Sequence, residues 1–255
     1  MDLEPKPRDI ITVIDELTEK AIKSGELVET PFATFRFPYL SDPRFLKSPF
    51  RDEILKIGVP EMTVGATKKA VEELTIKDKL EITTLIPEFD PNGNYKGGQA
   101  IFPSRVEIYF YPYSTNLVEG MRLTARTVGH ELNHCARLKK RGHGTTLLDD
   151  IVSEGLAVYY EEHWGGEYLR TVQGHNLTEE QIVEEFEKAK PLIDSEDYDA
   201  DSWRWGTGGA HPKQTIYSLG TRLVERFFQN NPKTTMREAV RMKSKRILKG
   251  SGLQL

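Results

Sequence analysis

Apolar residues recur at helical spacing in the segment 124–139 (TARTVGHELNHCARLK) of this 255-residue chain. Val128, Leu132 and Cys135 form an apolar ridge, and polar residues occupy the opposite side. Side chains that recur every three or four positions share one face of an α-helix. The pattern therefore predicts a helix that packs through this ridge and can present ligands on its other face.

The same reasoning predicts the other regular elements. Helical spacing predicts helices over residues 8–23, 66–74, 147–160, 179–190, 213–229 and 234–248. The helix at 179–190 is preceded by a capping-box signal, Thr178 with Gln181 three residues later. Alternating apolar and polar residues predict strands at 80–85 and 105–111. We expect an α+β fold that is mainly helical and has a small sheet.

Two histidines four residues apart, His130 and His134 in HELNH, lie on the polar face of the helix predicted at 124–139. Residues four apart differ by about 40° around a helix, so both imidazoles leave the same face one turn apart. This geometry suits two corners of a tetrahedral Zn²⁺ site. Glu131 then lies beside the open corner, where it can take a proton from a metal-bound water. The alternative is a pair of histidines on a solvated face.

A third ligand is predicted at Glu154, in the sequence SEGLA of the helix 147–160. Only a short, basic, glycine-containing connection (KKRGHG) separates this helix from the helix at 124–139, and such connections favour antiparallel neighbouring helices. Glu154 can then lie beside both histidines. Its apolar sequence neighbours favour this interpretation over the alternative, an ordinary surface glutamate.

These motifs carry a resemblance. HELNH, the spacing to SEGLA and the later YSLGTRLVERF together resemble a bacterial family known as predicted Zn-dependent proteases, formally a domain of unknown function. The resemblance covers roughly residues 97–242 and implies a gluzincin-like, zincin-like metallopeptidase core over 101–255, with a helix and strand region at 1–100. It implies a small antiparallel-type sheet over the HExxH helix. It also implies that one Zn²⁺ is held by His130, His134 and Glu154, with Glu131 as the general base.

The sequence departs from the gluzincin pattern at one position. Many gluzincins carry an acid four residues after the third ligand, and Val158 stands there in this chain. Orientation of a ligand histidine is then expected from elsewhere, with Asp149 or Asp150 as candidates. Alternatively, these aspartates interact with the positive end of their own helix.

Three further features are candidates for the site. Tyr217 opens the helix of the YSLG motif and could donate a hydrogen bond to an oxyanion, or it could be a core residue. His211, beside a glycine-rich turn, competes for the same catalytic role. The resemblance implies that the strand 105–111 holds an extended peptide by main-chain hydrogen bonds, and the alternative is an ordinary internal strand.

The composition of the chain indicates its expected partners and location. The net charge of −4 and the sequence pI of about 5.9 give no electrostatic reason to expect nucleic acid as a partner. A single cysteine, Cys135, excludes an internal disulfide framework and suits a reducing compartment. The chain starts MDLEPKPRDI, without an apolar segment, and no apolar run is long enough for a membrane span. We expect a cytoplasmic protein with no membrane partner.

The function expected from these features is that of a zinc metallopeptidase acting on a peptide or protein substrate. Two alternatives stay open: a zinc hydrolase of a non-peptide amide, and a non-catalytic module that binds peptide or protein around a structural zinc. Glu131 counts against the module, because structural sites need no base and are normally closed by four protein ligands.

Overall fold

The computed structural model describes residues 28–49, 51–52, 55, 58–86, 97–109, 117–164 and 170–253. The helix expected at 8–23 lies outside these residues. Contacts divide the chain into two units, residues 1–72 with 76–132 and residues 73–75 with 133–255. Each unit is described by itself below.

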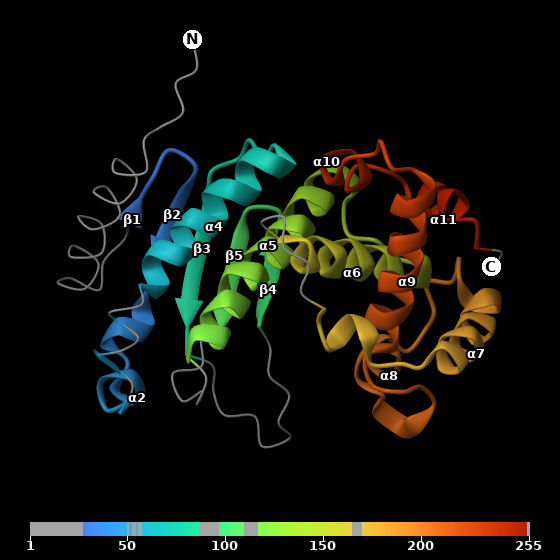
Figure 1. Cartoon of the computed structure of the whole chain (residues 1–255), viewed down its shortest axis with the longest axis horizontal. Helices are drawn as coiled ribbons and strands as arrows, with labels where there is room; N and C mark the ends of the chain where they lie inside the picture. The colour runs from blue at the N-terminus through green and yellow to red at the C-terminus, as the bar shows by residue number, and fades with distance from the viewer. Residues whose placement is uncertain are drawn as a thin grey trace, which may run out of the picture. The chain divides into compact units, whose positions relative to one another are not determined.

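The first unit contains a five-stranded sheet with the strand order β1-β2-β3-β5-β4 (Figure 1). Its strands are β1 (Val28–Glu29), β2 (Ala33–Arg36), β3 (Leu80–Leu85), β4 (Gly98–Phe102) and β5 (Arg105–Tyr109). The pairs β1–β2 and β4–β5 are antiparallel, whereas β2–β3 and β3–β5 are parallel. The sheet is therefore mixed, and the expected antiparallel-type sheet was wrong.

Connections explain the parallel pairs. The helix α4 (Val59–Leu74) lies in the chain between β2 and β3, and a crossover of this kind allows two strands to run in the same direction. β4 and β5 are joined by a short turn, and β5 lies between β3 and β4. The predicted strand at 80–85 and the helix at 66–74 are confirmed within β3 and α4.

Aromatic side chains fill the space between β2 and the short elements that follow it, η1 (Pro38–Ser41) and α2 (Pro43–Leu46). The rings form a continuous series in which each lies within 6.3 Å of the next, centroid to centroid. Its members are Phe35, Phe37, Tyr39 and Phe45, all about 1% exposed or less. This packing anchors the start of the sheet.

Helix α5 (Leu117–Arg141) contains the segment with the histidines. Val128, Leu132 and Cys135 have no exposed surface, which confirms the apolar ridge. The last turn carries Lys139, Lys140 and Arg141, cations that stabilise the negative end of a helix dipole.

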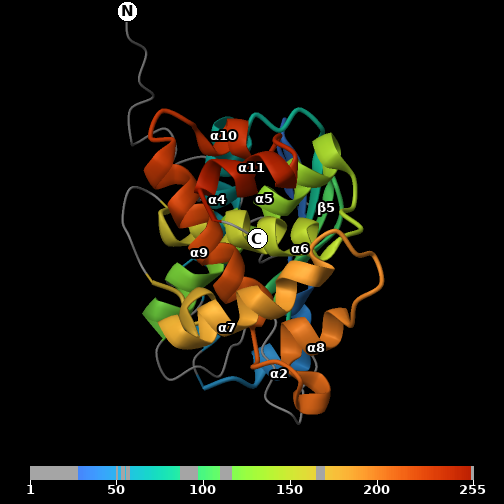
Figure 2. The same cartoon turned by 90° about the vertical axis from the view of Figure 1, so that its right-hand side faces the viewer.

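The second unit contains helices and connecting loops, with no strand among its described residues. Its elements are α6 (Leu147–Glu162), η3 (Gln173–His175), α7 (Glu179–Ala189), η4 (Lys190–Leu192), α8 (Ala200–Trp205), η5 (Thr207–Gly209), α9 (Thr215–Asn230), α10 (Met236–Ala239) and α11 (Ser244–Ser251). The predicted capping box at Thr178 and Gln181 is confirmed at the start of α7. Figure 2 shows α9 with α11 near one end and α7 near the other.

Helices α6 and α9 cross in close contact at two glycines (Figure 1). A Cβ atom on Gly155 would lie 2.2 Å from the carbonyl oxygen of Gly220, and one on Gly220 would lie 2.2 Å from that of Ile151. Both neighbours are backbone atoms, which cannot turn aside. The close approach of the two helices therefore requires glycine at both positions.

The predicted helix at 234–248 was wrong, because α10 and α11 are separate. Thr235 and Glu238 form a capping box that starts α10. Arg137 of α5 then donates hydrogen bonds to the backbone oxygen of Met242 (3.2 Å) and to Ser244 Oγ (2.7 Å). These tertiary bonds hold the chain between the two short helices and compete with one continuous helix.

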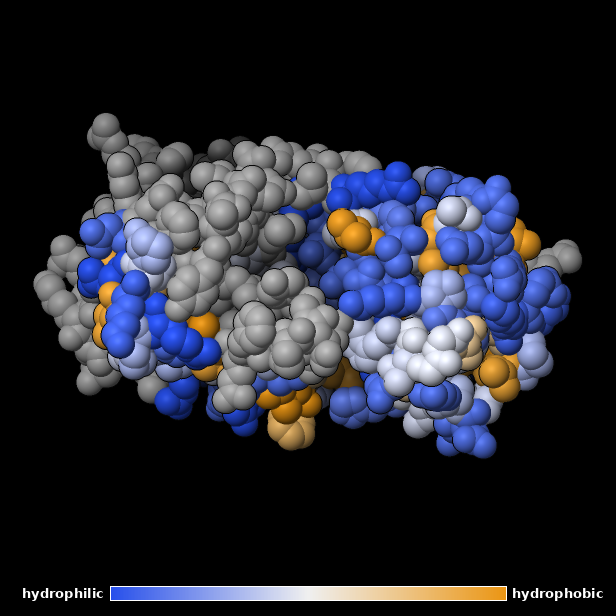
Figure 3. All heavy atoms as spheres, turned by 90° about the horizontal axis from the view of Figure 1, so that it is seen from below, coloured by the Kyte–Doolittle hydropathy of each residue, from blue (hydrophilic) through white to orange (hydrophobic). Residues whose placement is uncertain are grey.

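Hydrophilic residues prevail over the described surface seen in Figure 3, with apolar residues in small groups. The large apolar side chains that are exposed lie on separate elements: Leu46, Phe102, Val172 and Val183. Within the described residues, no helix combines the length and the apolar character that crossing a bilayer requires.

Candidate metal centre

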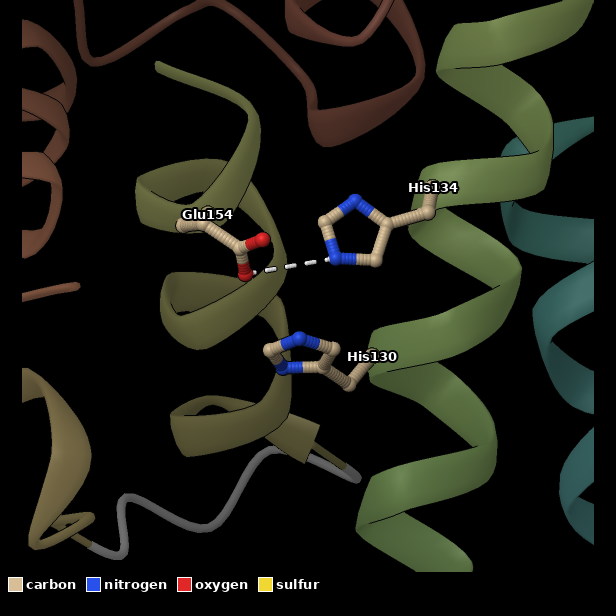
Figure 4. A group of neighbouring side chains, drawn as sticks. All are labelled: His130, His134 and Glu154. Atoms are coloured by element: carbon tan, nitrogen blue, oxygen red, sulfur yellow. Dashed lines mark ion pairs between the residues drawn. The ribbon is translucent and has the colours of Figure 1, made fainter. Parts of the chain in front are cut away.

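Helix α5 presents the two histidines on the side away from its apolar ridge. His130 is 7% exposed and the side chain of His134 is 14% exposed. Because both residues belong to one uninterrupted helix, the one-turn offset between their rings is set by helix geometry. Figure 4 shows the two imidazoles projecting from α5 on the same side.

Glu154 of α6 completes a group of three potential ligands. One ligand atom from each of His130, His134 and Glu154 lies within 4.8 Å of the others. His134 Nε2 is 3.4 Å from Glu154 Oε2 (Figure 4). Metal–ligand bonds of about 2.0–2.1 Å place two corners of a tetrahedral zinc site about 3.3–3.4 Å apart. The pair His134 and Glu154 has this spacing, and the donor set of two imidazoles and one carboxylate fits a Zn²⁺ ion.

Ser153 orients one of the imidazoles. Its Oγ lies 3.1 Å from Nδ1 of His134. A hydrogen bond from the Nδ1–H group to this hydroxyl leaves Nε2, which faces Glu154, with its lone pair available for a metal. A partner of this kind fixes both the ring orientation and the tautomer of a ligand histidine. Nothing in the sequence pattern had singled out this serine.

The expected partners Asp149 and Asp150 form other bonds. Asp149 accepts hydrogen bonds from Thr146 and Ser244, and these outweigh the effect of burial and lower its pKa. Both aspartates lie in the first turn of α6, in agreement with the alternative that they interact with the positive end of the helix.

Asp150 anchors a half-buried polar network next to the centre. It accepts hydrogen bonds from Tyr198 Oη (2.6 Å) and from Arg204 Nη2 (2.7 Å). Burial raises the pKa of Asp150, and the Arg204 guanidinium acts to lower it. Electrostatic interaction with Glu154 acts to raise this pKa, and interaction with His134 acts to lower it. The network therefore lies within electrostatic reach of two of the three potential ligands.

Removing the serine hydroxyl tests its role. Ser153→Ala is expected to weaken zinc binding by about 10-fold, the lower end of the range for outer partners of metal ligands. The measurement is a competition titration with a chelator of known zinc affinity. Ser195→Ala removes a hydroxyl that bonds to the backbone of Asp197, and should leave the affinity unchanged. Equal affinities for Ser153→Ala and the parent protein would contradict the assignment.

Glu131 lies against strand β4 within the first unit. It is 6% exposed. A Cβ atom on Gly98 would lie 2.8 Å from Cγ and 3.1 Å from Oε1 of this glutamate, so the absent side chain of Gly98 leaves room for the carboxylate. The structure thus places an acid one residue from His130 and directly beside the first residue of β4.

A comparison with known protein families agrees with this site. A family model described as "Predicted Zn-dependent protease" matches residues 67–249, well over half of the chain. The chain belongs to this family. Searches of curated proteins and of solved structures found no match. The resemblance seen in the motifs is confirmed, and the family description agrees with a ligand set that suits zinc.

For this member of the family, the sheet corrects the expectation about the strand 105–111. β5 pairs with β3 on one side and with β4 on the other, so it is an internal strand and its main chain is already hydrogen-bonded. β4 pairs with β5 alone among the described residues and forms an edge. The sequence had not predicted β4, because Gly98 and Gly97 resemble the end of a turn.

A Gly98→Ala substitution tests the contact between β4 and Glu131. The added methyl group would meet both the glutamate side chain and the carbonyl oxygen of Glu107, at 2.9 Å. If Glu131 acts as a base, zinc should be retained and turnover should fall by about 10²-fold, the loss expected when a reacting group is misplaced by about 1 Å. Zinc content and kcat are measured on the same preparation. Gly97→Ala, whose methyl group would meet Thr127 instead, serves as the control, and an equal loss there would contradict a specific effect on Glu131.

Tyr217 and His211 both lie in the second unit. Tyr217 is 9% exposed in the first turn of α9, with its ring centroid 6.2 Å from that of Trp205. His211 Nδ1 lies 2.6 Å from Oε2 of the buried Glu185, and its ring stacks on Trp203 at 3.8 Å. These contacts tie the loop of His211 to α7 and α8, and a catalytic role for either residue stays a prediction.

Proposed function

We propose that the protein is a zinc-dependent metallopeptidase that hydrolyses peptide bonds, with Glu131 as the general base. The observation that carries the proposal is the convergence of His130, His134 and Glu154, with Glu131 next to the first of them on the same helix. A purely structural site has no use for this acid.

His130, His134 and Glu154 would hold a Zn²⁺ ion, which would supply Lewis acidity for activating a water and polarising a carbonyl group. Glu131 accepts the proton of the attacking water and returns it to the leaving amine. The side chain is confined between α5 and Gly98, so its carboxylate has little freedom to turn away. Positioning of this kind is what makes a weak base effective in proton transfer.

The edge strand β4 is the proposed substrate-binding strand. An extended peptide can add to an exposed sheet edge through main-chain hydrogen bonds. Gly98, at the start of this edge, lies directly against Glu131. A peptide paired with β4 therefore passes close to the proposed base. This arrangement favours a peptide over a small amide as the substrate.

Tyr217 is proposed as the donor to the oxyanion. The pKa of Arg204 supports this position: burial acts to lower it, but electrostatic interactions with Asp150, Glu154, Tyr217 and Tyr198 raise it. Glu154 and Tyr217 thus lie within electrostatic reach of one guanidinium. A phenol there can donate a hydrogen bond to the charge that develops on a carbonyl oxygen. We also propose a cytoplasmic location, supported by the single, buried cysteine.

Digestion of a diverse peptide pool tests the function. The zinc-loaded protein is incubated with the pool, and new termini are identified by mass spectrometry. We expect cleavage that disappears after chelation and returns when zinc is added. Zinc-loaded, folded protein that leaves every peptide intact would exclude the peptidase and favour hydrolysis of a different amide.

A further inference from the structure

A second group of potential metal ligands lies within the helical unit. Glu162 is the last residue of α6, His175 belongs to η3, and Glu225 lies in α9. One ligand atom from each lies within 4.8 Å of the others. We propose that these three residues form a second Zn²⁺ site, independent of the proteolytic function proposed above.

Glu162 is held rigidly in this cluster. Its side chain has no exposed surface. Oε1 accepts hydrogen bonds from the backbone N–H of Thr171 (2.7 Å) and from its hydroxyl (3.0 Å), and it lies 2.9 Å from His175 Nε2. The carboxylate is therefore oriented toward the histidine by the protein itself. A ligand fixed in advance loses little conformational entropy when it binds an ion.

The short element η3 is pressed against both helices, which fixes His175. A Cβ atom on Gly174 would lie 2.6 Å from Thr221 Oγ1 of α9 and 2.8 Å from Val158 Cγ1 of α6. A larger residue at this position would have to displace the side chains of both helices. Ser218 Oγ of α9 also donates a hydrogen bond to the backbone oxygen of Gln173 (3.4 Å). The imidazole is thus presented to α6 and α9 by a docked turn.

The charges of the cluster favour a cation. It contains two carboxylates and one imidazole, and no lysine or arginine in the described part of the chain forms an ion pair with Glu225. Burial raises the pKa of Tyr159, and the negative charge of Glu225 raises it further. Like charges in close proximity are unfavourable unless an opposite charge accompanies them. A divalent ion at their centre supplies it.

The donor set points to zinc. Imidazole nitrogen suits Zn²⁺ better than Mg²⁺ or Ca²⁺, and zinc also accepts carboxylate oxygen. Glu162 follows Glu154 by eight positions, which is about 12 Å along a helix, whereas the ions of a two-metal catalytic site lie about 3.5–4 Å apart. A zinc here would tie η3 to the helix that carries Glu154, without taking part in hydrolysis.

Zinc content per folded chain tests the proposal. The proteins are the parent, His134→Ala (one ligand of the first site removed), His175→Asn (one ligand of the second removed) and the double variant. Each is dialysed against the same zinc-containing buffer, and bound metal is measured by elemental mass spectrometry. We expect two ions, one, one and none, respectively. Zinc should also raise the Tm of His134→Ala but leave that of the double variant unchanged.

Glu225→Gln repeats the test at a partly buried position with a nearly isosteric side chain, and should lose one ion as His175→Asn does. Glu179→Gln, a change at an exposed carboxylate of α7, is the control and should keep two ions. Folded His134→Ala that binds no zinc and gains no thermal stability from it would overturn the proposal and leave the cluster as an ion pair. That outcome is distinct from failure of the peptidase assay, which the parent protein reports separately.

Discussion

Glu131→Gln is expected to keep its zinc and to lose peptide hydrolysis by about 10²–10⁴-fold, the contribution typical of general acid–base catalysis. The amide has nearly the shape of the carboxylate, so it fits the same space beside Gly98. It cannot accept the proton of the attacking water, however. Turnover of a peptide found in the pool digestion is measured together with zinc content.

Two variants make the result specific. His134→Ala removes a proposed ligand and should lose both the metal and the activity. Glu187→Gln changes an exposed carboxylate of α7 and should alter neither. If Glu131→Gln turns over as fast as the parent protein, the proposed base is wrong.

Gly155→Ala is expected to produce the largest loss of stability. Its methyl group would meet the backbone of Gly220 at 2.2 Å, so α6 and α9 must move apart. Overpacking of this kind costs about 3 kcal/mol when the neighbour cannot turn aside. For a chain of this size the cost corresponds to a fall in Tm of about 6 °C or more, measured by calorimetry. Because Glu154 precedes the substituted residue, zinc affinity should fall as well.

Gly65→Ala is the matched control for this substitution. Gly65 also lies in a helix, α4, but a Cβ atom there would have no neighbour within 4 Å. Alanine has the higher helix propensity, so this change should stabilise the protein by about 0.5–1 kcal/mol. A similar Tm for both variants would show that the crossing of α6 and α9 does not depend on glycine.

Features that depend on neighbouring residues along the chain can be predicted from the amino-acid sequence alone. The apolar ridge of α5 and the capping box of α7 follow from short-range spacing, and both are confirmed. The strand 80–85 was predicted with the bounds that β3 has. The spacing of His130 and His134 is equally local, since any α-helix over these residues brings the rings together. Local geometry of this kind needs no knowledge of the fold.

Features that depend on residues distant in the chain arise from tertiary packing. Whether β5 is an edge or an internal strand depends on which strands pair with it, and its own alternation is the same in both cases. The break between α10 and α11 comes from Arg137, more than a hundred residues earlier. Likewise, Ser153 acquires its role only because α6 lies beside α5 at that turn.

The two clusters of potential ligands show the same division. All three members of the first were named from the sequence: His130 and His134 share one helix, and Glu154 follows after a short connection. Glu162, His175 and Glu225 have no common motif, since they lie on three elements that only the packing of α6, η3 and α9 brings together. Spacing along one helix is encoded locally, whereas the meeting of separate elements depends on the packing of the whole core.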